Sequence, residues 1–392
     1  MKCIFTAALA ALLLLTLSAC APSAPEPPEE EPPVTEEPEV QTPDPEPTPE
    51  ELAAAEIEDL LSSLTLEEKV GQLFFVRCPA ESAVEDVSTY HLGGYVLFGR
   101  DFADKTADDV IQTICSYQSA SESDTGIPLL IGVDEEGGTV VRVSSSPNLR
   151  PSRYKSPQKL LSEGGTEALV ADAADKDALL QALGINVNLA PVADVSTDPS
   201  DFMYDRTCGL DAAGTADCVS AMVAQMATDG MGSVLKHFPG YGDNVDTHTG
   251  IAVDKRSLEH FAASDFLPFS AGIDAGGGTA AVLVSHNIMA AVDPDLPSSL
   301  SPAVHDLLRD KLGFDGVAMT DDLAMEAVAA YSEDGAVAVM ALQAGNDLII
   351  TTDYRTQIPR VIEAAENGTL SLERIDQACR RVLTWKQNLG LV

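Results

Sequence analysis

The sequence predicts an α/β fold, a (β/α)8 or TIM barrel built as a single domain, from three observations. Eight short apolar runs recur along the chain, helix-like stretches lie between most of them, and residues 51–392 give the length of a barrel with insertions. Apolar strands separated by helices indicate a parallel sheet covered on both faces. A doubly wound open sheet shares this alternation, but eight strands over this length favour closure into a barrel.

The expected strands are rich in Val, Ile, Leu and Phe. They are Val70–Val76, Gly94–Phe98, Leu129–Val133, Ile185–Ala190, Ser233–Leu235, Ala281–Ser285, Gly316–Thr320 and Asp347–Thr351. The helix-like stretches include Thr106–Ser121, Gly165–Leu183, Ala212–Thr228 and Asp322–Gln343. A last helix over Ser371–Leu389, with Leu372, Ile375, Ala378, Val382 and Leu389 near helical spacing, would close the ring, and we expect no further folded domain.

Residues 1–19 have the layout of a secretory signal peptide, in which Lys2 precedes an apolar run that is too short for a convincing membrane span. The run ends in Leu-Ser-Ala-Cys at Cys20, which resembles the bacterial lipobox, where the cysteine is lipidated. The alternative is an ordinary signal peptide that contains a cysteine. We expect lipidation at Cys20, and hence a protein anchored to the extracytoplasmic face of the cell membrane.

Residues 20–55 are expected to be the lipidated cysteine and a disordered tether, and residues 56–392 the barrel. Positions 21–50 hold eleven prolines and ten acidic residues, so they cannot bury enough apolar surface to fold. The net charge of −39 argues against nucleic acid and other anionic polymers as partners.

The cysteines and histidines do not predict a cofactor or a metal centre. Beyond the N-terminal segment, five widely spaced cysteines remain without a CxxC motif: Cys78, Cys115, Cys208, Cys218 and Cys379. Cys208 and Cys218 are the nearest pair for a single disulfide, which spacing alone does not establish.

Polar residues follow five of the expected strands in succession. They are Asp134-Glu135-Glu136, Asp194 with Asp205-Arg206, Lys236-His237, Ser285-His286 and Asp321-Asp322. A single residue of this kind is more simply a helix cap or an ion pair. Because the carboxyl ends of barrel strands meet in one mouth, five in succession predict an active site.

Asp321 has the strongest position, because it lies between an apolar strand and a helical pattern and should point into the barrel mouth. Asp322 is then expected to be the helix N-cap or a first-turn residue. A carboxylate beside the anomeric carbon of a sugar can attack that carbon or stabilise positive charge there.

The stretch Gly240–Gly250 is a glycine-bracketed loop without hydrophobic periodicity. Its Asp246 and His248 are two residues apart, so the carboxylate can hold the imidazole for proton transfer near neutral pH. An ordinary hydrogen bond within the loop explains the spacing equally well. A metal site is disfavoured, because Lys236 would repel a cation.

Taken together, these motifs resemble glycoside hydrolase family 3, in particular its single-domain β-N-acetylglucosaminidases of the NagZ type. The resemblance covers residues 57–392 and rests on Val133–Gly138, Asn188–Val195, Asp205–Thr207, Lys236–Gly240, Asp246–His248 and Thr320–Met325. It implies a retaining mechanism with Asp321 as nucleophile, His248 as general acid/base and Asp246 as its polarising partner. It also implies sugar binding by Asp134, Arg142, Arg206, Lys236 and His237.

Three departures from the family pattern surround the expected pocket. Tyr241 replaces a histidine, the segment from Gly242 to Asp246 is one residue shorter, and Tyr204–Cys208 replaces Gly-Asp-Arg-Ser-Phe. These changes bear on leaving-group preference more than on the chemistry.

The resemblance implies exo-hydrolysis of terminal β-linked N-acetylglucosamine, with peptidoglycan fragments as the small carbohydrate substrate. The alternatives are a β-glucosidase or β-xylosidase, a phosphorylase, and a non-catalytic sugar-binding lipoprotein. The Asp246–His248 pair argues against the first, and eight consecutive βα units argue against the last. A neutral histidine does not repel phosphate, so phosphorolysis stays open.

Overall fold

The computed structural model describes residues 47–242, 244, 252–329, 331 and 336–392. The chain divides into two units, Met1–Pro47 and Thr48–Val392, and the fold belongs to the second. The expected signal peptide, Cys20 and most of the expected tether lie outside the described residues, as do Asp246 and His248. Helix α1 (Pro49–Ser63) begins within the segment expected to be tether, with Thr48 as its N-cap.

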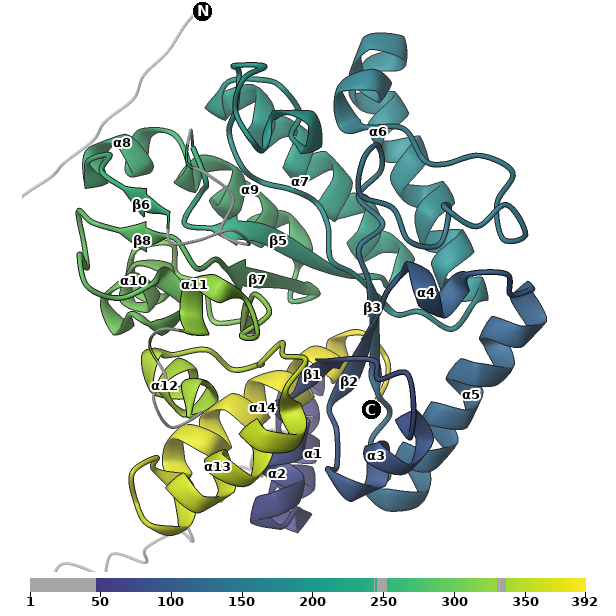
Figure 1. Cartoon of the computed structure of the whole chain (residues 1–392), viewed down its shortest axis with the longest axis vertical. Coiled ribbons are helices and arrows are strands. Elements are labelled where there is room, and N and C mark those ends of the chain that lie inside the picture. Colours follow the sequence, from purple (N-terminus) through teal and green to yellow (C-terminus); the bar gives the residue numbers. More distant parts are fainter. Residues whose placement is uncertain (1–46, 243, 245–251, 330, 332–335) are drawn as a thin grey trace, which may run out of the picture. The chain divides into compact units, whose positions relative to one another are not determined.

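Seven parallel strands form one sheet in the order β1-β2-β3-β4-β5-β7-β9 (Figure 1). They are β1 (Phe75–Arg77), β2 (Gly94–Leu97), β3 (Leu130–Val133), β4 (Val187–Asn188), β5 (Gly232–Phe238), β7 (Ala280–Val284) and β9 (Ala318–Thr320). The expected eighth strand, Asp347–Thr351, pairs with its neighbours through two isolated parallel bridges, and we call it the eighth strand segment. Leu348 pairs with Met319, and Ile349 pairs with Phe74. These bridges join the last strand of the sheet to the first, which confirms the predicted barrel.

The position predicted for the first strand is wrong. Residues 70–72 belong to helix α2 (Leu66–Gln72), and the strand begins at Phe75. Thr65 and Glu68 form a capping box, in which Thr65 Oγ1 accepts from the Glu68 N–H at 3.3 Å and Glu68 accepts from the Thr65 N–H at 2.7 Å. This box starts a helix at the point where the apolar run suggested a strand. The strand therefore ends on Arg77.

Helices surround the sheet, as Figure 1 shows. The helices not yet given are α3 (Ala83–Thr89), α4 (Gly99–Phe102), α5 (Ala107–Asp124), α6 (Pro157–Ala182), α7 (Ala212–Asp229), α8 (Leu258–Ala263), α9 (Phe266–Gly276), α10 (Pro302–Asp306), α11 (Glu326–Ala329), α12 (Val337–Ala344), α13 (Tyr354–Glu366) and α14 (Leu372–Asn388). Short helical turns η1 (Tyr204–Arg206), η2 (Ser298–Leu300) and η3 (Leu307–Lys311), and a two-stranded parallel sheet of β6 (Val253–Asp254) and β8 (Ile288–Met289), complete the elements.

The single helix expected over Asp322–Gln343 is wrong. It is divided into α11 and α12, and the described residues between them, Tyr331 and Ala336, belong to neither helix. The last helix, α14, matches its prediction. It buries Ile375, Ala378 and Val382, whereas Leu372, which was expected on the same face, is exposed.

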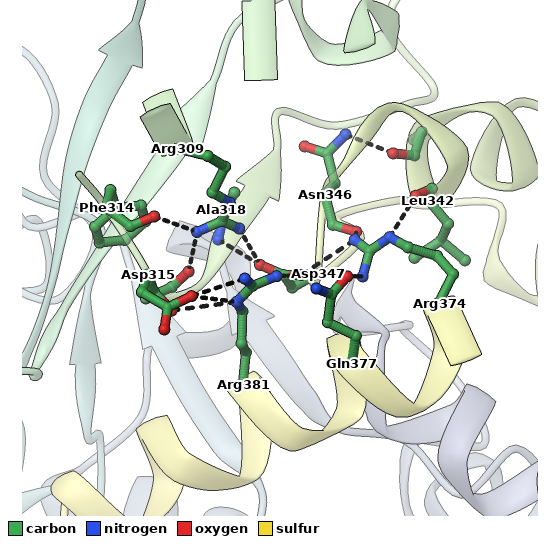
Figure 2. A network of polar contacts seen from close by, with 12 residues as sticks. Arg309, Phe314, Asp315, Ala318, Leu342, Asn346, Asp347, Arg374, Gln377 and Arg381 are labelled. Carbon is green, nitrogen blue, oxygen red and sulfur yellow. Dashed lines mark hydrogen bonds and ion pairs between the residues drawn. The ribbon is translucent and has the colours of Figure 1, made fainter. Parts of the chain in front are cut away.

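The base of the barrel carries a network of arginines around the buried carboxylate of Asp347 (Figure 2). Asp347 Oδ2 accepts from Arg309 at 2.5 Å, and Oδ1 accepts from Arg374 at 3.1 Å and from Arg381 at 3.3 Å. The Ala318 N–H donates to Asp347 Oδ2 at 3.1 Å. The network therefore ties the start of the eighth strand segment to β9, η3 and α14.

The described residues contain neither a disulfide nor a helix that could span a membrane. Cys78, Cys115, Cys208, Cys218 and Cys379 are free, so Cys208 and Cys218 do not form a disulfide, although both lie in one small apolar cluster. Within residues 47–392, apart from the short stretches left undescribed, no helix has the length and apolar character needed to span a membrane.

Candidate active site

The carboxyl ends of the strands surround a cavity of about 340 Å³, within the size range of small-ligand sites. Its polar lining includes all five residues predicted to bind sugar and Asp321: Asp134, Arg142, Arg206, Lys236, His237 and Asp321. Asp134 and Asp321 directly follow β3 and β9, and Lys236 and His237 lie near the carboxyl end of β5. The other two, Arg142 and Arg206, lie in the segments that follow β3 and β4. The fold therefore brings together residues that lie up to 187 positions apart, from Asp134 to Asp321.

Lys236 links two acidic residues of the Asp134-Glu135-Glu136 motif. Its side chain is 2% exposed, and its ammonium nitrogen lies 2.7 Å from Asp134 Oδ1 and 2.7 Å from Glu136 Oε1. Arg206 also binds Glu136. Its Nε donates to Oε2 at 2.9 Å and its Nη2 donates to Oε1 at 2.6 Å. Such a two-pronged contact fixes the guanidinium plane as well as its position. Both cations thus reach the cavity in a set orientation.

The charge states of this cluster follow from its pairing. Burial alone would raise the pKa of Glu136, but the cations of Lys236 and Arg206 hold that pKa well below its usual range. Burial would lower the pKa of Lys236, and the carboxylates of Asp134 and Glu136 reverse that effect, so the pKa is raised. Glu136 and Lys236 are therefore both charged at neutral pH.

His237 is held by a second buried carboxylate, that of Asp194. His237 Nδ1 lies 2.8 Å from Asp194 Oδ2, and its backbone N–H donates to the same oxygen at 3.2 Å. Arg206 Nη2 is 3.4 Å from His237 Nε2. Because a guanidinium can only donate, Nε2 is the acceptor and Nδ1 carries the proton in the neutral ring.

Glu135 has a purely positional role between its two acidic neighbours. It is fully buried, and its Oε2 accepts from the backbone N–H groups of Arg142 and Val143, both at 2.8 Å. It thereby shapes the loop that carries Arg142 into the cavity. The Arg142 guanidinium itself lies 3.5 Å from Asp134 Oδ2.

Asp321 follows β9 directly. Its backbone N–H donates to the carbonyl of Val284 on β7 at 3.1 Å, and its Oδ1 accepts from the Asp322 N–H at 2.8 Å. The neighbouring strand therefore fixes the backbone on which this carboxylate is mounted. Asp321 lines the cavity, as the sequence predicted.

Asp322 is not the helix cap that was expected. Its Oδ1 accepts from the N–H groups of Ala324 at 3.0 Å and Thr352 at 3.1 Å, and its Oδ2 accepts from the Thr352 hydroxyl at 2.8 Å. Helix α11 begins only at Glu326. Asp322 instead joins the loop after β9 to the end of the eighth strand segment.

The model for the N-terminal domain of glycosyl hydrolase family 3 matches residues 65–385 of this chain. The chain belongs to glycoside hydrolase family 3. A beta-hexosaminidase of Idiomarina loihiensis is 33% identical over 276 residues, which cover 70% of this chain and 80% of that relative. A beta-hexosaminidase of Methylococcus capsulatus is 30% identical over 282 residues, 71% of this chain and 81% of the relative.

Two solved family 3 structures are similar in fold. A beta-N-acetylglucosaminidase from a Paenibacillus species superposes with a TM-score of 0.77 at 32% identity, covering 84% of this chain and 63% of that one. A beta-N-acetylhexosaminidase from Beutenbergia cavernae gives a TM-score of 0.74 at 32% identity, covering 83% and 99%. This chain thus spans less than two thirds of the Paenibacillus protein.

The family 3 motif after β5 departs from the usual sequence at Tyr241. This side chain is 2% exposed and meets the His237 ring edge-on, with ring centroids 5.3 Å apart. Its backbone N–H donates to Asp194 Oδ1 at 2.8 Å. The tyrosine therefore packs against the face of the site that Asp194 and His237 form.

Four further residues at the site had been given no role of their own from the sequence. Glu136 and Asp194 lie in motifs that the sequence singled out, so their positions at strand exits were a usable signal. Arg77 and Phe98 also line the cavity, at the ends of β1 and β2. Arg77 directly follows the expected strand Val70–Val76, so its position was a usable signal as well, whereas Phe98 is the apolar last residue of an expected strand.

No group of three or more His, Cys, Asp or Glu side chains suited to a metal ion occurs among the residues that the structure describes. The two proposed acid/base residues, Asp246 and His248, belong to the undescribed residues 245–251.

Proposed function

We propose that this chain is a β-N-acetylhexosaminidase that hydrolyses terminal, non-reducing β-linked N-acetylglucosamine. The observation that carries the proposal is the meeting of Asp321 with Asp134, Arg206, Lys236 and His237 in one cavity. A carboxylate opposite a fixed set of donors and acceptors suits attack on a bound sugar ring. The names of the family 3 relatives support the choice of N-acetylglucosamine.

The proposed mechanism retains configuration in two steps. Asp321 attacks the anomeric carbon and forms an ester bond to it while the glycosidic bond breaks and His248 gives its proton to the leaving oxygen. His248 then removes a proton from water, which attacks the same carbon and releases Asp321 and the sugar. Asp246 would orient the His248 ring. The roles of His248 and Asp246 rest on the sequence resemblance.

The ion network supports the sugar-binding part of the proposal. Lys236 and Arg206 are anchored by Glu136, so their remaining donors are oriented before a ligand arrives. Asp134 uses one oxygen for Lys236, and its other lone pairs can accept hydrogen bonds from ring hydroxyls. Preorganised polar groups of this kind avoid the cost of reorientation during the reaction.

The test is hydrolysis of an aryl β-N-acetylglucosaminide by the wild type, Asp321→Asn and Asp353→Asn. Asp353 is the matched control, because its exposed carboxylate lies beyond the eighth strand segment, bonds to Thr356 and does not line the cavity. We expect Asp321→Asn to lower kcat by ~10³-fold or more, as for loss of an essential nucleophile. The control should retain wild-type turnover.

Three outcomes would count against the proposal. Wild-type turnover by Asp321→Asn would show that Asp321 is not the nucleophile. Faster cleavage of the aryl glucoside than of the acetamido sugar would show that N-acetylglucosamine is not the preferred substrate. Turnover that depends on added phosphate would assign the chain to phosphorolysis.

We also propose that residues 1–19 are a signal peptide and that Cys20 is lipidated, which would hold the enzyme on the extracytoplasmic side of the cell membrane. Peptidoglycan fragments are the natural substrate that this position favours. Acyl chains on one cysteine would account for stable membrane attachment. A Cys20→Ala variant should leave the membrane fraction with unchanged hydrolytic activity, and retention in that fraction would contradict the anchor.

A further inference from the structure

One arginine joins the two described ends of residues 245–251, the stretch of sequence that includes the proposed acid/base and that we call the acid/base segment. Arg256 follows β6 and donates through all three guanidinium nitrogens. Nη2 donates to the carbonyl of Gly240 at 3.2 Å, Nε to Asp254 Oδ2 at 2.9 Å, and Nη1 to Asp265 Oδ1 at 2.9 Å. Gly240 precedes the acid/base segment and Asp254 follows it, so a single side chain ties both ends together.

Asn244 adds a second tie between the same two ends. Its Nδ2 donates to the carbonyl of Tyr241 at 2.8 Å and to Asp254 Oδ2 at 2.7 Å. The backbone around Asp254 is fixed in turn, because β6 pairs with β8 (Figure 1) and the Ala290 N–H donates to the Asp254 carbonyl at 2.9 Å. The end that follows the acid/base segment is therefore attached to the chain that follows β7.

Burial and stacking fix the orientation of the Arg256 guanidinium. The side chains of Asp254 and Asp265 are 2% and 1% exposed, and the guanidinium carbon lies 4.4 Å from the centroid of the Phe261 ring. A planar group that binds two carboxylates and stacks on a ring has one orientation. Gly242 passes directly against it, since a Cβ there would lie 2.5 Å from the guanidinium carbon.

Arg256 is separated from the reacting atoms. It lies outside the cavity lining that the structure describes, whereas its contacts are with the two ends of the acid/base segment. A general acid must come within hydrogen-bond reach of the leaving oxygen, and a small displacement removes much of its effect. Joining the ends of a short segment lowers the conformational entropy that is lost when one of its side chains is placed.

We propose that Arg256 is a positioning residue for proton transfer to the leaving group. It acts through the acid/base segment, whose two ends it joins to the carboxylates of Asp254 and Asp265. The inference rests on the proposed role of His248 as general acid, and adds the residue that holds the segment in which His248 lies. Loss of Arg256 therefore impairs bond cleavage that needs a proton more than it impairs attack by Asp321.

The test compares kcat/KM, which includes only steps up to glycosidic bond cleavage, for two substrates. The leaving sugar of N,N′-diacetylchitobiose needs a proton, whereas the phenolate of 2,4-dinitrophenyl β-N-acetylglucosaminide leaves without one. Arg256→Gln should lower kcat/KM for the disaccharide by about tenfold or more, a part of what a general acid contributes. The aryl substrate should change by less than about threefold. Arg256→Lys, which keeps the charge without the planar fork, should restore part of the loss.

Asn244→Ala tests the second tie without removing a buried charge. It should lower kcat/KM for the disaccharide alone by about fivefold, as for loss of a hydrogen bond of ordinary strength. This variant decides the question if Arg256→Gln does not fold, which its thermal unfolding shows.

Arg355→Gln is the matched control. Arg355 also binds a buried carboxylate, that of Asp86, through Nε at 3.2 Å and Nη2 at 2.6 Å, and it too lies outside the described cavity lining. Its removal should leave the ratio of the two kcat/KM values unchanged.

Two results would overturn the inference. An equal loss on both substrates in Arg256→Gln would assign the arginine to folding or to sugar binding. An unchanged ratio in Arg256→Gln and Asn244→Ala would show that these ties do not serve proton transfer. His248→Ala, measured in parallel, should show the largest selective loss, and its absence would refute the proposed general acid and the inference with it. Failure of the wild type to cleave either substrate would instead refute the proposed function.

Discussion

Three consecutive carboxylates after β3 have three different roles. Asp134 faces the cavity and Lys236, Glu135 holds the backbone of the following loop, and Glu136 binds Lys236 and Arg206. Their residue types are nearly identical, so the direction in which each side chain points decides the role. Glu136 is the one that binds both Lys236 and Arg206.

Replacement of Glu136 by glutamine should therefore destabilise the protein. The substitution keeps the shape but leaves Lys236 and Arg206 without their shared charge, a change that costs on the order of 3–5 kcal/mol for buried pairs. Chemical denaturation at pH 7 measures the loss. Glu163→Gln, at an exposed pair with Lys155, is the control and should be unchanged.

The pH dependence of this effect has a definite sign. The pKa of Glu136 in the folded protein is held below its ordinary value of 4.5, so the stabilisation is complete above pH 4.5 and is lost as the pH falls below it. The stability difference between wild type and Glu136→Gln should shrink over that range. A constant difference down to pH 3 would show that the glutamate charge is not responsible.

Lys386 on α14 is a second buried charge, remote from the cavity. Its side chain is fully buried and donates to Gln72 Oε1 at 2.7 Å. Burial lowers the pKa of Lys386 from 10.5 to about 7, an effect that the nearby Cys379 partly opposes. The folded protein therefore holds this lysine neutral at pH values where the unfolded chain holds it protonated.

Lys386→Met should flatten the rise of stability with pH. Between pH 7 and 10.5 the unfolded wild type binds the extra proton, so its free energy of unfolding gains up to a few kcal/mol as the pH rises. Urea denaturation across this range checks the slope, with the exposed Lys159→Met as control. An identical slope in Lys386→Met would contradict the assignment.

At the scale of the elements, the alternation of apolar runs and helices was predictable because each signal is local. The starts of β2, β3 and β5 fall within one residue of their predicted positions. Strand β1 was not predictable from hydrophobicity, because Val70 lies on the buried face of α2 and continues the apolar run. The capping box at Thr65 and Glu68 was present in the sequence and would have separated helix from strand.

The candidate site was predictable where the ends of its strands could be placed from the sequence. Asp134 and Asp321 directly follow their strands, Lys236 and His237 lie near the end of β5, and all four line the cavity. Arg77 was missed although it directly follows the expected strand Val70–Val76. The pairing of Glu136 with Arg206 joins positions 70 residues apart, and no local pattern encodes such a contact.

At the scale of the whole molecule, the two ends of the barrel have different tasks. The mouth gathers groups whose donors and acceptors remain available to a ligand. At the base, the arginines around Asp347 use their donors on that carboxylate and on backbone carbonyls such as those of Phe314 and Gly316 (Figure 2). Chemistry at one face and stability at the other is the usual division in barrels of this kind.

Asp347→Asn should weaken closure of the barrel without altering the site. Arg309, Arg374 and Arg381 would lose their common carboxylate, with an expected loss of about 3–5 kcal/mol in the free energy of unfolding. Activity below the unfolding transition should be retained. Asp315→Asn, at a carboxylate that is 91% exposed, is the control and should have little effect. Equal stability of the two variants would mean that the network does not hold the ring closed.

The role of Asp321 is tested most directly by trapping the covalent intermediate. An activated N-acetylglucosaminyl donor, fluorinated to slow the second step, is incubated with the enzyme, which is then digested and analysed by tandem mass spectrometry. We predict one sugar residue attached to Asp321 and none on the adjacent Asp322. Attachment to another residue, or continued turnover by Asp321→Asn without any attachment, would contradict the mechanism.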